Sequence, residues 1–124
     1  DSGRITLEDT EEETRIRLTL RFDRAWASVL KGTEDADFLI NDRDRSEGLL
    51  YVTFVGPRGE KESGWFDWLW GGEDEHPLAN RQYQIHLNRA GEELTLITLR
   101  GPDGGAVDRR DQQALLTILR GNIT

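Results

Sequence analysis

Apolar and polar residues alternate along several parts of the chain, and this period of two predicts β-strands with one buried face. In TRIRLTLRF, for example, Ile16, Leu18 and Leu20 lie on one side and arginines lie on the other. LLYVTFV is apolar on both sides, so we expect this strand to be central or covered on both faces. The segments predicted as strands are residues 14–22, 37–46, 49–55, 81–87 and 93–100.

Residues that follow the first strand repeat with a helical period. Asp23 is predicted to cap this helix, with Phe22 as a hydrophobic staple before it. The positions expected to face inward are Ala25, Trp26, Val29 and Leu30. Such a stripe is typical of a helix packed by one face on a core, and we expect the helix to end between residues 33 and 36.

The last part of the chain predicts a second, C-terminal helix. Asp108 is expected to be its cap, Asp111 lies near the positive end of its dipole, and Gly121 is a plausible stop. Its apolar stripe consists of Ala114, Leu115, Ile118 and Leu119.

The predicted order is β-α-β-β-insert-β-β-α. Strands joined by short turns form an antiparallel sheet, and two one-sided helices must cover a face of it, so the fold class is α+β with about five strands. Residues 1–13, which end in the acidic run 11–13, are predicted to be a linker or a disordered start. Residues 14–124 are then one domain, with an inserted loop at residues 56–80.

The insert contains GWFDWLWGG at residues 64–72, with three of the chain's four tryptophans. Two interpretations stay open. The segment can fold back and cap an open end of the core, or its rings can form a contact surface for a partner, since tryptophan is enriched at interaction hot spots. The candidate contact residues are Trp65, Phe66, Trp68, Leu69 and Trp70.

Composition narrows the classes of function. A length of 124 residues is most simply one domain, and a net charge of −8 argues against nucleic acid or an anionic membrane surface as a partner. Cysteine is absent, which excludes disulfides and thiolate sites. Because the chain has no methionine and begins at Asp1, we expect a piece of a longer protein, with any lipid anchor in the missing part.

The sequence offers little for catalysis or metal binding. His76 follows three acidic residues, but such a run is more often a solvated loop, and His86 is interpreted as a solvated strand residue. A calcium loop starting at Asp42 fails, because its sixth position is Glu47 and its twelfth is Thr53. We therefore predict no enzymatic activity, no cofactor and no metal site.

The motif DRDRS at residues 42–46 has a simpler structural interpretation. Asp42 and Asp44 are expected on one side of a strand, with Arg43 and Arg45 on the other, so that each row pairs with neighbouring strands.

Taken together, three motifs resemble a known family. FDRAW at 22–26, DRDRSEG at 42–48 and YVTF at 51–54 are similar to the repeated domain of BamC (NlpB), a lipoprotein of the outer-membrane β-barrel assembly machinery. YQIHLNRAGEELTLITLRGPDGGAVD and the closing ALLTIL continue the resemblance to about residue 120. It implies a helix-grip fold, in which a curved antiparallel sheet is packed on a long C-terminal helix, with a second helix after the first strand.

The resemblance also implies a function. It points to a non-catalytic accessory domain of a periplasmic, outer-membrane lipoprotein from a Gram-negative bacterium, favouring the C-terminal of two such domains. Its partners would be other subunits of the machinery, BamD or BamA-like, or client proteins. The lipid anchor and the segment that docks onto BamD in this family are absent from the chain. Contacts would involve the tryptophan-rich residues, with Arg43 and Arg45 as a lesser polar patch.

A carrier is the alternative hypothesis. Related helix-grip architectures hold apolar ligands between sheet and helix. In this chain Trp26, Phe54 and Tyr83 could line such a cavity.

Overall fold

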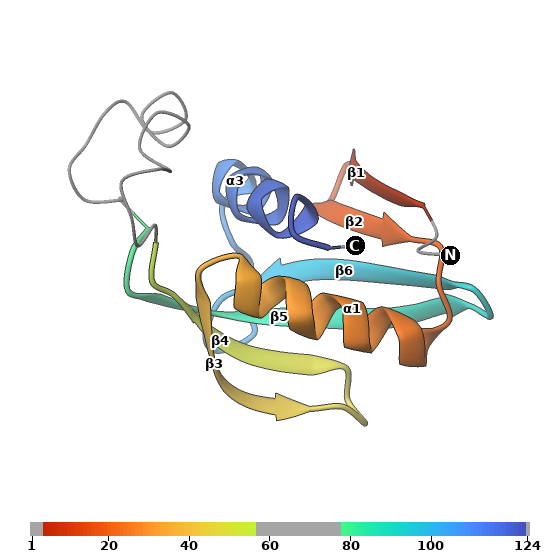
Figure 1. Ribbon diagram of the computed structural model, residues 1–124. Coiled ribbons are helices and arrows are strands. Elements are labelled where there is room, and N and C mark those ends of the chain that lie inside the picture. Colours follow the sequence, from red (N-terminus) through yellow and green to blue (C-terminus); the bar gives the residue numbers. More distant parts are fainter. Residues whose placement is uncertain (1–3, 57–77, 124) are drawn as a thin grey trace.

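One antiparallel sheet and two helices make up the part of the chain that the computed structural model describes, residues 4–56 and 78–123 (Figure 1). In chain order the elements are β1 (Ile5–Asp9), β2 (Thr14–Leu18), α1 (Phe22–Asp35), β3 (Phe38–Asp44), β4 (Leu49–Phe54), β5 (Arg81–Gly91), β6 (Leu94–Arg100) and α3 (Arg109–Arg120). The sheet order is β1-β2-β6-β5-β4-β3, and both helices pack on the same face. The predicted α+β class is confirmed.

Two details of the prediction were wrong. The sheet has six strands, because β1 lies within residues 1–13, where we expected a linker or a disordered start. Ile5 and Leu7 of β1 are half-buried and pack against the core, so this short strand is stabilised by contacts that its own sequence does not show. We also expected a long C-terminal helix, but α3 has 12 residues and is shorter than α1, which has 14.

The core lies between the sheet and the helices. The predicted inward residues Ile16 and Leu18 of β2 are buried there, as are the alternating residues Tyr83, Ile85 and Leu87 of β5. Register places inward residues side by side across the sheet, as in the row Ile16–Ile97–Leu87. The strand LLYVTFV lies second from one edge of the sheet, with one face buried and the other half-buried. It is therefore an interior strand, paired on both sides, but only one of its faces is fully covered.

The start of α1 differs from the prediction. Arg21, with an extended backbone, is the N-cap residue, and its carbonyl accepts the first helical hydrogen bond from the amide of Ala25 (2.8 Å). Asp23 therefore lies in the first turn, where a carboxylate is favoured by the helix dipole, and does not cap the helix. The helix ends at Asp35, inside the predicted interval.

The C-terminal helix follows the prediction closely. Asp108 is its N-cap residue, although its side chain makes no capping hydrogen bond; Asp111 lies in the first turn, and the helix ends at Gly121, whose backbone is right-handed (φ −64°). The predicted stripe is buried: Ala114, Leu115, Ile118 and Leu119. None of the helices in the described ranges is long and apolar enough to cross a membrane.

Candidate interaction site

The turn that joins β3 to β4 is ordered by side-chain hydrogen bonds of the DRDRS motif. Asp44 accepts a bond from the hydroxyl of Ser46 (2.8 Å) and a longer one from the amide of Glu47 (3.3 Å). The amide of Gly48 closes the turn on the carbonyl of Arg45 (3.1 Å). The short side chains of aspartate and serine favour turns for this reason, so the motif is first of all a structural device.

Gly48 fastens this turn to the neighbouring strand β5. Its φ of +69° lies in the left-handed region, and a Cβ at this position would collide with the carbonyl oxygen of Leu87. The amide of Leu87 donates a hydrogen bond of 2.7 Å to the carbonyl of Gly48. Only glycine combines this backbone conformation with such a close approach.

Aromatic contacts organise the start of α1 beside that turn. The rings of Phe22 and Trp26 stack with their centroids 6.2 Å apart. The guanidinium of Arg89, from β5, lies over the Phe22 ring at 5.0 Å from its centroid. This cation–π arrangement joins α1 to β5, the strand to which Gly48 is hydrogen-bonded.

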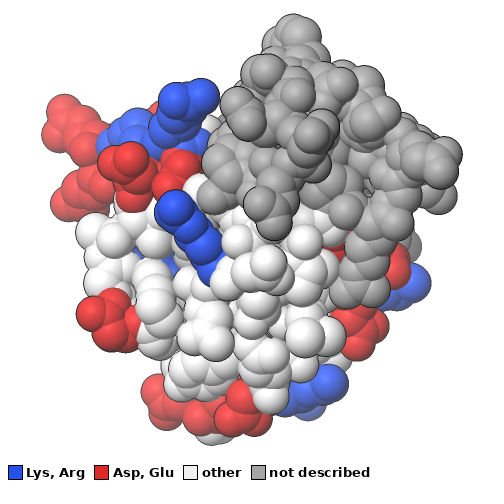
Figure 2. All heavy atoms as spheres, turned by 90° about the vertical axis from the view of Figure 1, so that its left-hand side faces the viewer, with Lys and Arg blue, Asp and Glu red and all other residues white. Residues whose placement is uncertain are grey.

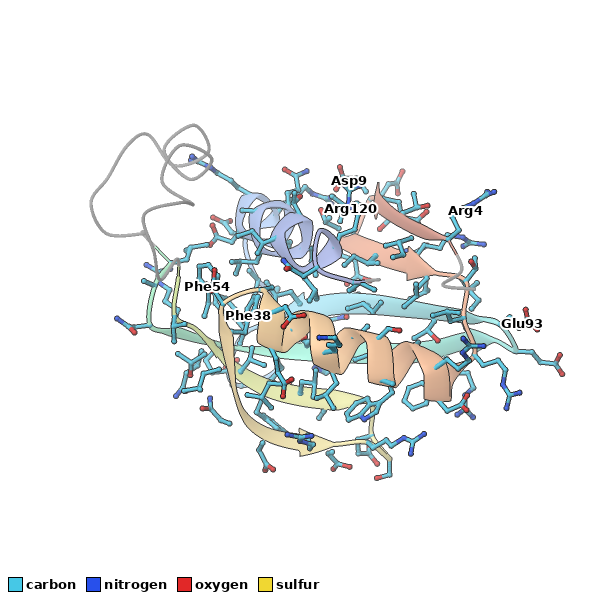
Figure 3. All side chains as sticks on the ribbon, in the orientation of Figure 1. Arg4, Asp9, Phe38, Phe54, Glu93 and Arg120 are labelled. Atoms are coloured by element: carbon cyan, nitrogen blue, oxygen red, sulfur yellow. The ribbon has the colours of Figure 1, made fainter. Side chains whose placement is uncertain are left out.

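These elements surround an open cleft of about 1220 Å³ on the helix-covered side of the sheet. The start of α1, the β3–β4 turn and the β5–β6 turn form its walls. Glu93, in the β5–β6 turn, lies at the end of the molecule where α1 begins (Figure 3). The lining residues are Arg21, Phe22, Asp23, Arg45, Ser46, Glu47, Gly48, Leu87, Asn88, Arg89, Glu92 and Glu93.

Charges of both signs line the cleft. Arg21 pairs with Asp23 at 3.5 Å, and both side chains are mostly exposed. Within residues 4–56 and 78–123, no ion pair involves Arg45, Arg89 or the three glutamates of the lining. These charges are therefore available to a partner. Figure 2 shows the opposite end of the molecule, where uncharged residues make up the lower middle of the visible face, a basic side chain lies above them, and further charged residues lie at the margin.

The structure separates the two arginines that we had grouped as a polar patch. Arg45 lies in the turn and lines the cleft. Arg43 belongs to β3 and pairs in register with Leu50, while Asp42 and Asp44 pair with Tyr51 and Leu49. The predicted pairing of each row with neighbouring strands was wrong in two ways: β3 is an edge strand with one neighbour, and in the described part of the chain the two aspartates accept backbone and serine hydrogen bonds.

The predicted aromatic site cannot be compared with the structure. Its residues lie outside the described ranges, as does His76 with the acids beside it; the site consists of Trp65, Phe66, Trp68, Leu69 and Trp70. The interpretations of this segment therefore remain predictions.

The three residues proposed to line a carrier cavity are core residues. Trp26, Phe54 and Tyr83 are at most 7% exposed and belong to the buried cluster, and none of them lines the cleft. Side chains of the protein itself occupy the space between sheet and helices at these positions.

Titratable groups with shifted pKa values lie away from the cleft. Partial burial and the nearby Arg100 lower the pKa of His86, whose Nε2 is 2.9 Å from Oε1 of Gln84. Burial, with Asp108 nearby, raises the pKa of Asp111, and burial, with Asp111 nearby, raises that of Tyr83. Among the described residues, no group of three or more histidine, aspartate or glutamate side chains could hold a metal ion.

Sequence reasoning missed most of the cleft. Arg89 and Glu92 lie between the predicted strands 81–87 and 93–100, and Glu93 begins the second of these strands, so we assigned none of them to a site. The alternation of β5 offered one signal, because Arg89 continues the inward row of Ile85 and Leu87. A charged residue among inward-facing positions indicates that the helices no longer cover the sheet at that point.

Comparison with known proteins gives consistent matches. Residues 3–123 match the family model described as the outer membrane protein assembly factor BamC-like C-terminal domain. The chain is 32% identical over 93 residues to the outer membrane protein assembly factor BamC of Pseudoalteromonas atlantica, a match that covers 74% of this chain and 24% of that protein. The protein of the same name from Thiobacillus denitrificans is 30% identical over 102 residues, 79% of this chain and 28% of that protein. The chain thus spans about a quarter of the length of these relatives.

Proposed function

The chain belongs to the family of BamC-like C-terminal domains, and from this membership we propose that it is a non-catalytic accessory domain that takes part in the assembly of outer-membrane proteins through protein–protein contacts. The proposed location is the periplasmic side of the outer membrane, reached through a lipid anchor on the longer protein. The proposed partners are other subunits of the assembly machinery, of the BamD or BamA kind, or client proteins.

The cleft at the start of α1 is the structural observation that supports protein–protein contacts as the means of this function. It combines Arg45 and Arg89, which make no ion pair within the described residues, with a half-buried phenylalanine and with glutamates. Arginine and aromatic residues are enriched at protein interfaces, which have an apolar centre and a polar rim. Sites for small apolar ligands are instead enclosed and mainly apolar. The lining therefore favours a polypeptide partner over the ligand of a carrier.

Site-specific photo-crosslinking in the longer protein tests this proposal. A photoreactive amino acid would replace Arg45 in the cleft or, as a matched control, the exposed Arg24 of α1, which does not line it. Crosslinked proteins from intact cells would be identified by mass spectrometry. We expect the cleft position to capture assembly-machinery subunits or outer-membrane clients, and the control position to capture them much less.

A charge reversal gives an independent test. Arg45→Glu with Arg89→Glu changes the sign of two cleft charges, whereas Arg24→Glu changes one charge elsewhere. Co-purification of the machinery from detergent extracts should be reduced by the cleft variant alone. The cleft is not the contact surface if two results are found together. The charge-reversal variant would be folded and would retain every partner, and the photoreactive residue at position 45 would capture none.

A further inference from the structure

The sheet has two edges, and they differ in how they are protected against pairing with another strand. At one edge, β3 has an irregularity between Ile40 and Asp42, where its register with β4 shifts. At the other edge, β1 pairs with β2 over five consecutive residues without any shift. Bulges are one of the devices by which proteins protect edge strands, so in the described residues only the β1 edge is regular.

The outward backbone groups of β1 belong to its odd-numbered residues. The amide of Thr19 bonds to the carbonyl of Arg4 (3.0 Å), and the amide of Thr10 bonds to the carbonyl of Glu13 (2.8 Å). Residues of an antiparallel strand alternate in the direction of their backbone groups. The even-numbered residues 4–10 therefore face β2, and the amides and carbonyls of Ile5 and Leu7 point away from the sheet.

The sequence of this edge is self-complementary about Thr6. When two copies of residues 4–8, RITLE, run antiparallel with Thr6 opposite Thr6, Ile5 of each copy lies opposite Leu7 of the other. Arg4 of each copy then lies opposite Glu8 of the other. Opposite charges, aliphatic pairs and paired threonines across strands are all stabilising.

Backbone geometry is compatible with this register. The groups that point outward are those of Ile5, Leu7 and Asp9, and this register places Ile5 and Leu7 opposite each other as hydrogen-bonded pairs. Side-chain pairing distinguishes it from the other registers that the backbone allows. A shift by two residues that centres on Leu7 would place Ile5 opposite Asp9, and one that centres on Glu8 would place like charges opposite each other. Glu8 already accepts a bond from Arg15 (2.7 Å) through Oε2, and its second oxygen remains for Arg4 of the other copy.

The β3 edge lacks this complementarity around Arg43. An antiparallel pair of β3 strands centred on Arg43 would place the two arginines together and would place Asp42 opposite Asp44. Like charges directly opposite are destabilising.

We propose that the β1 edge is a self-association surface at which two copies of this chain pair through antiparallel β1 strands, with Thr6 on the two-fold axis and Arg4 of each copy beside Glu8 of the other. Figure 3 shows Arg4 and Asp9 at opposite ends of this strand. An interface of one strand pair is small, so association is weak and depends on concentration.

Sedimentation velocity over micromolar to millimolar concentrations tests the proposal. Wild-type protein should shift from monomer to dimer. Arg4→Glu or Glu8→Arg alone should weaken dimerisation by roughly tenfold, because each change creates two repulsive pairs. An equimolar mixture of the two variants should form a heterodimer, since their charges are complementary at both positions. Arg43→Glu, on the other edge strand, is the control and should dimerise as wild type does.

Hydrogen exchange gives a residue-level readout. The amides of Ile5 and Leu7 should become protected as concentration rises, while those of Thr6 and Glu8 are protected at every concentration by β2. A protein that stays monomeric at millimolar concentration overturns the proposal. So does a dimer that is insensitive to both charge variants, or one in which another surface becomes protected. Protection of Ile5 and Leu7 only upon addition of a different protein would show that the edge serves another partner.

Discussion

The backbone amide of Leu87 donates a 2.7 Å hydrogen bond to the carbonyl of Gly48, and this bond ties the β3–β4 turn to the middle of strand β5. Arg45 and Glu47 of this turn and Arg89 of β5 all line the cleft. The glycine of the DRDRSEG motif is explained by this contact.

Replacement of Gly48 by alanine should therefore be strongly destabilising. The left-handed backbone costs about 1–3 kcal/mol for a residue with a side chain, and the new methyl group would also collide with the carbonyl of Leu87. We expect a loss of about 3 kcal/mol in the free energy of unfolding, measured by urea denaturation. Gly104→Ala is the control: its φ is +88°, but the nearest atom, Oε1 of Gln84, is 3.7 Å away. An equal loss in both variants would show that the collision contributes nothing.

The hydroxyl of Thr98 is buried and has no hydrogen-bond partner within the described residues. Thr98→Val removes this hydroxyl and keeps the shape, so we expect a gain of about 1 kcal/mol in unfolding free energy. Thr95→Val is the matched variant, because the buried hydroxyl of Thr95 donates to the carbonyl of Leu20 (3.2 Å). That variant should lose about 1 kcal/mol. Effects of the same sign in both would contradict the assignment.

The contact between Phe22 and Arg89 can be measured by a double-mutant cycle. Phe22→Leu, Arg89→Gln and the double variant should give a coupling free energy of about 0.5–1 kcal/mol, typical of a partly exposed cation–π pair. Thermal or urea unfolding supplies the values. The same cycle with Arg24 in place of Arg89 should give no coupling, and a coupling near zero for Arg89 would show that the stacked geometry is not energetically relevant.

His86 should make stability depend on pH. Partial burial and Arg100 lower its pKa in the folded state, so the unfolded chain, with a pKa of about 6.5, binds the proton more readily. Its contribution to stability is fully present above about pH 6.5 and is lost as the pH falls through the lower folded value. Urea denaturation between about pH 7.5 and 5 should show this slope, and His86→Gln should reduce it. A slope unchanged in that variant would assign it to other groups.

The motifs of the DRDRSEG turn and the FDRAW helix start were enough to identify the family, and the matches over residues 3–123 confirm it. Five of the strands and the apolar stripes of both helices were also predictable. Each of these signals is local, because a strand or helix with one buried face must repeat its apolar residues along its own sequence.

Strand β1 and the cleft depended on contacts between distant segments. The pattern of Ile5 and Leu7 is too short to indicate a strand; pairing with β2 and packing on α3 stabilise it. Likewise, Arg45, Arg89 and Phe22 come from a turn, a strand and a helix, and no spacing in the chain relates them. The sequence by itself determined which face of each element is buried. Only the tertiary structure decided which exposed charges meet, since polar residues at a surface carry no periodic constraint of their own.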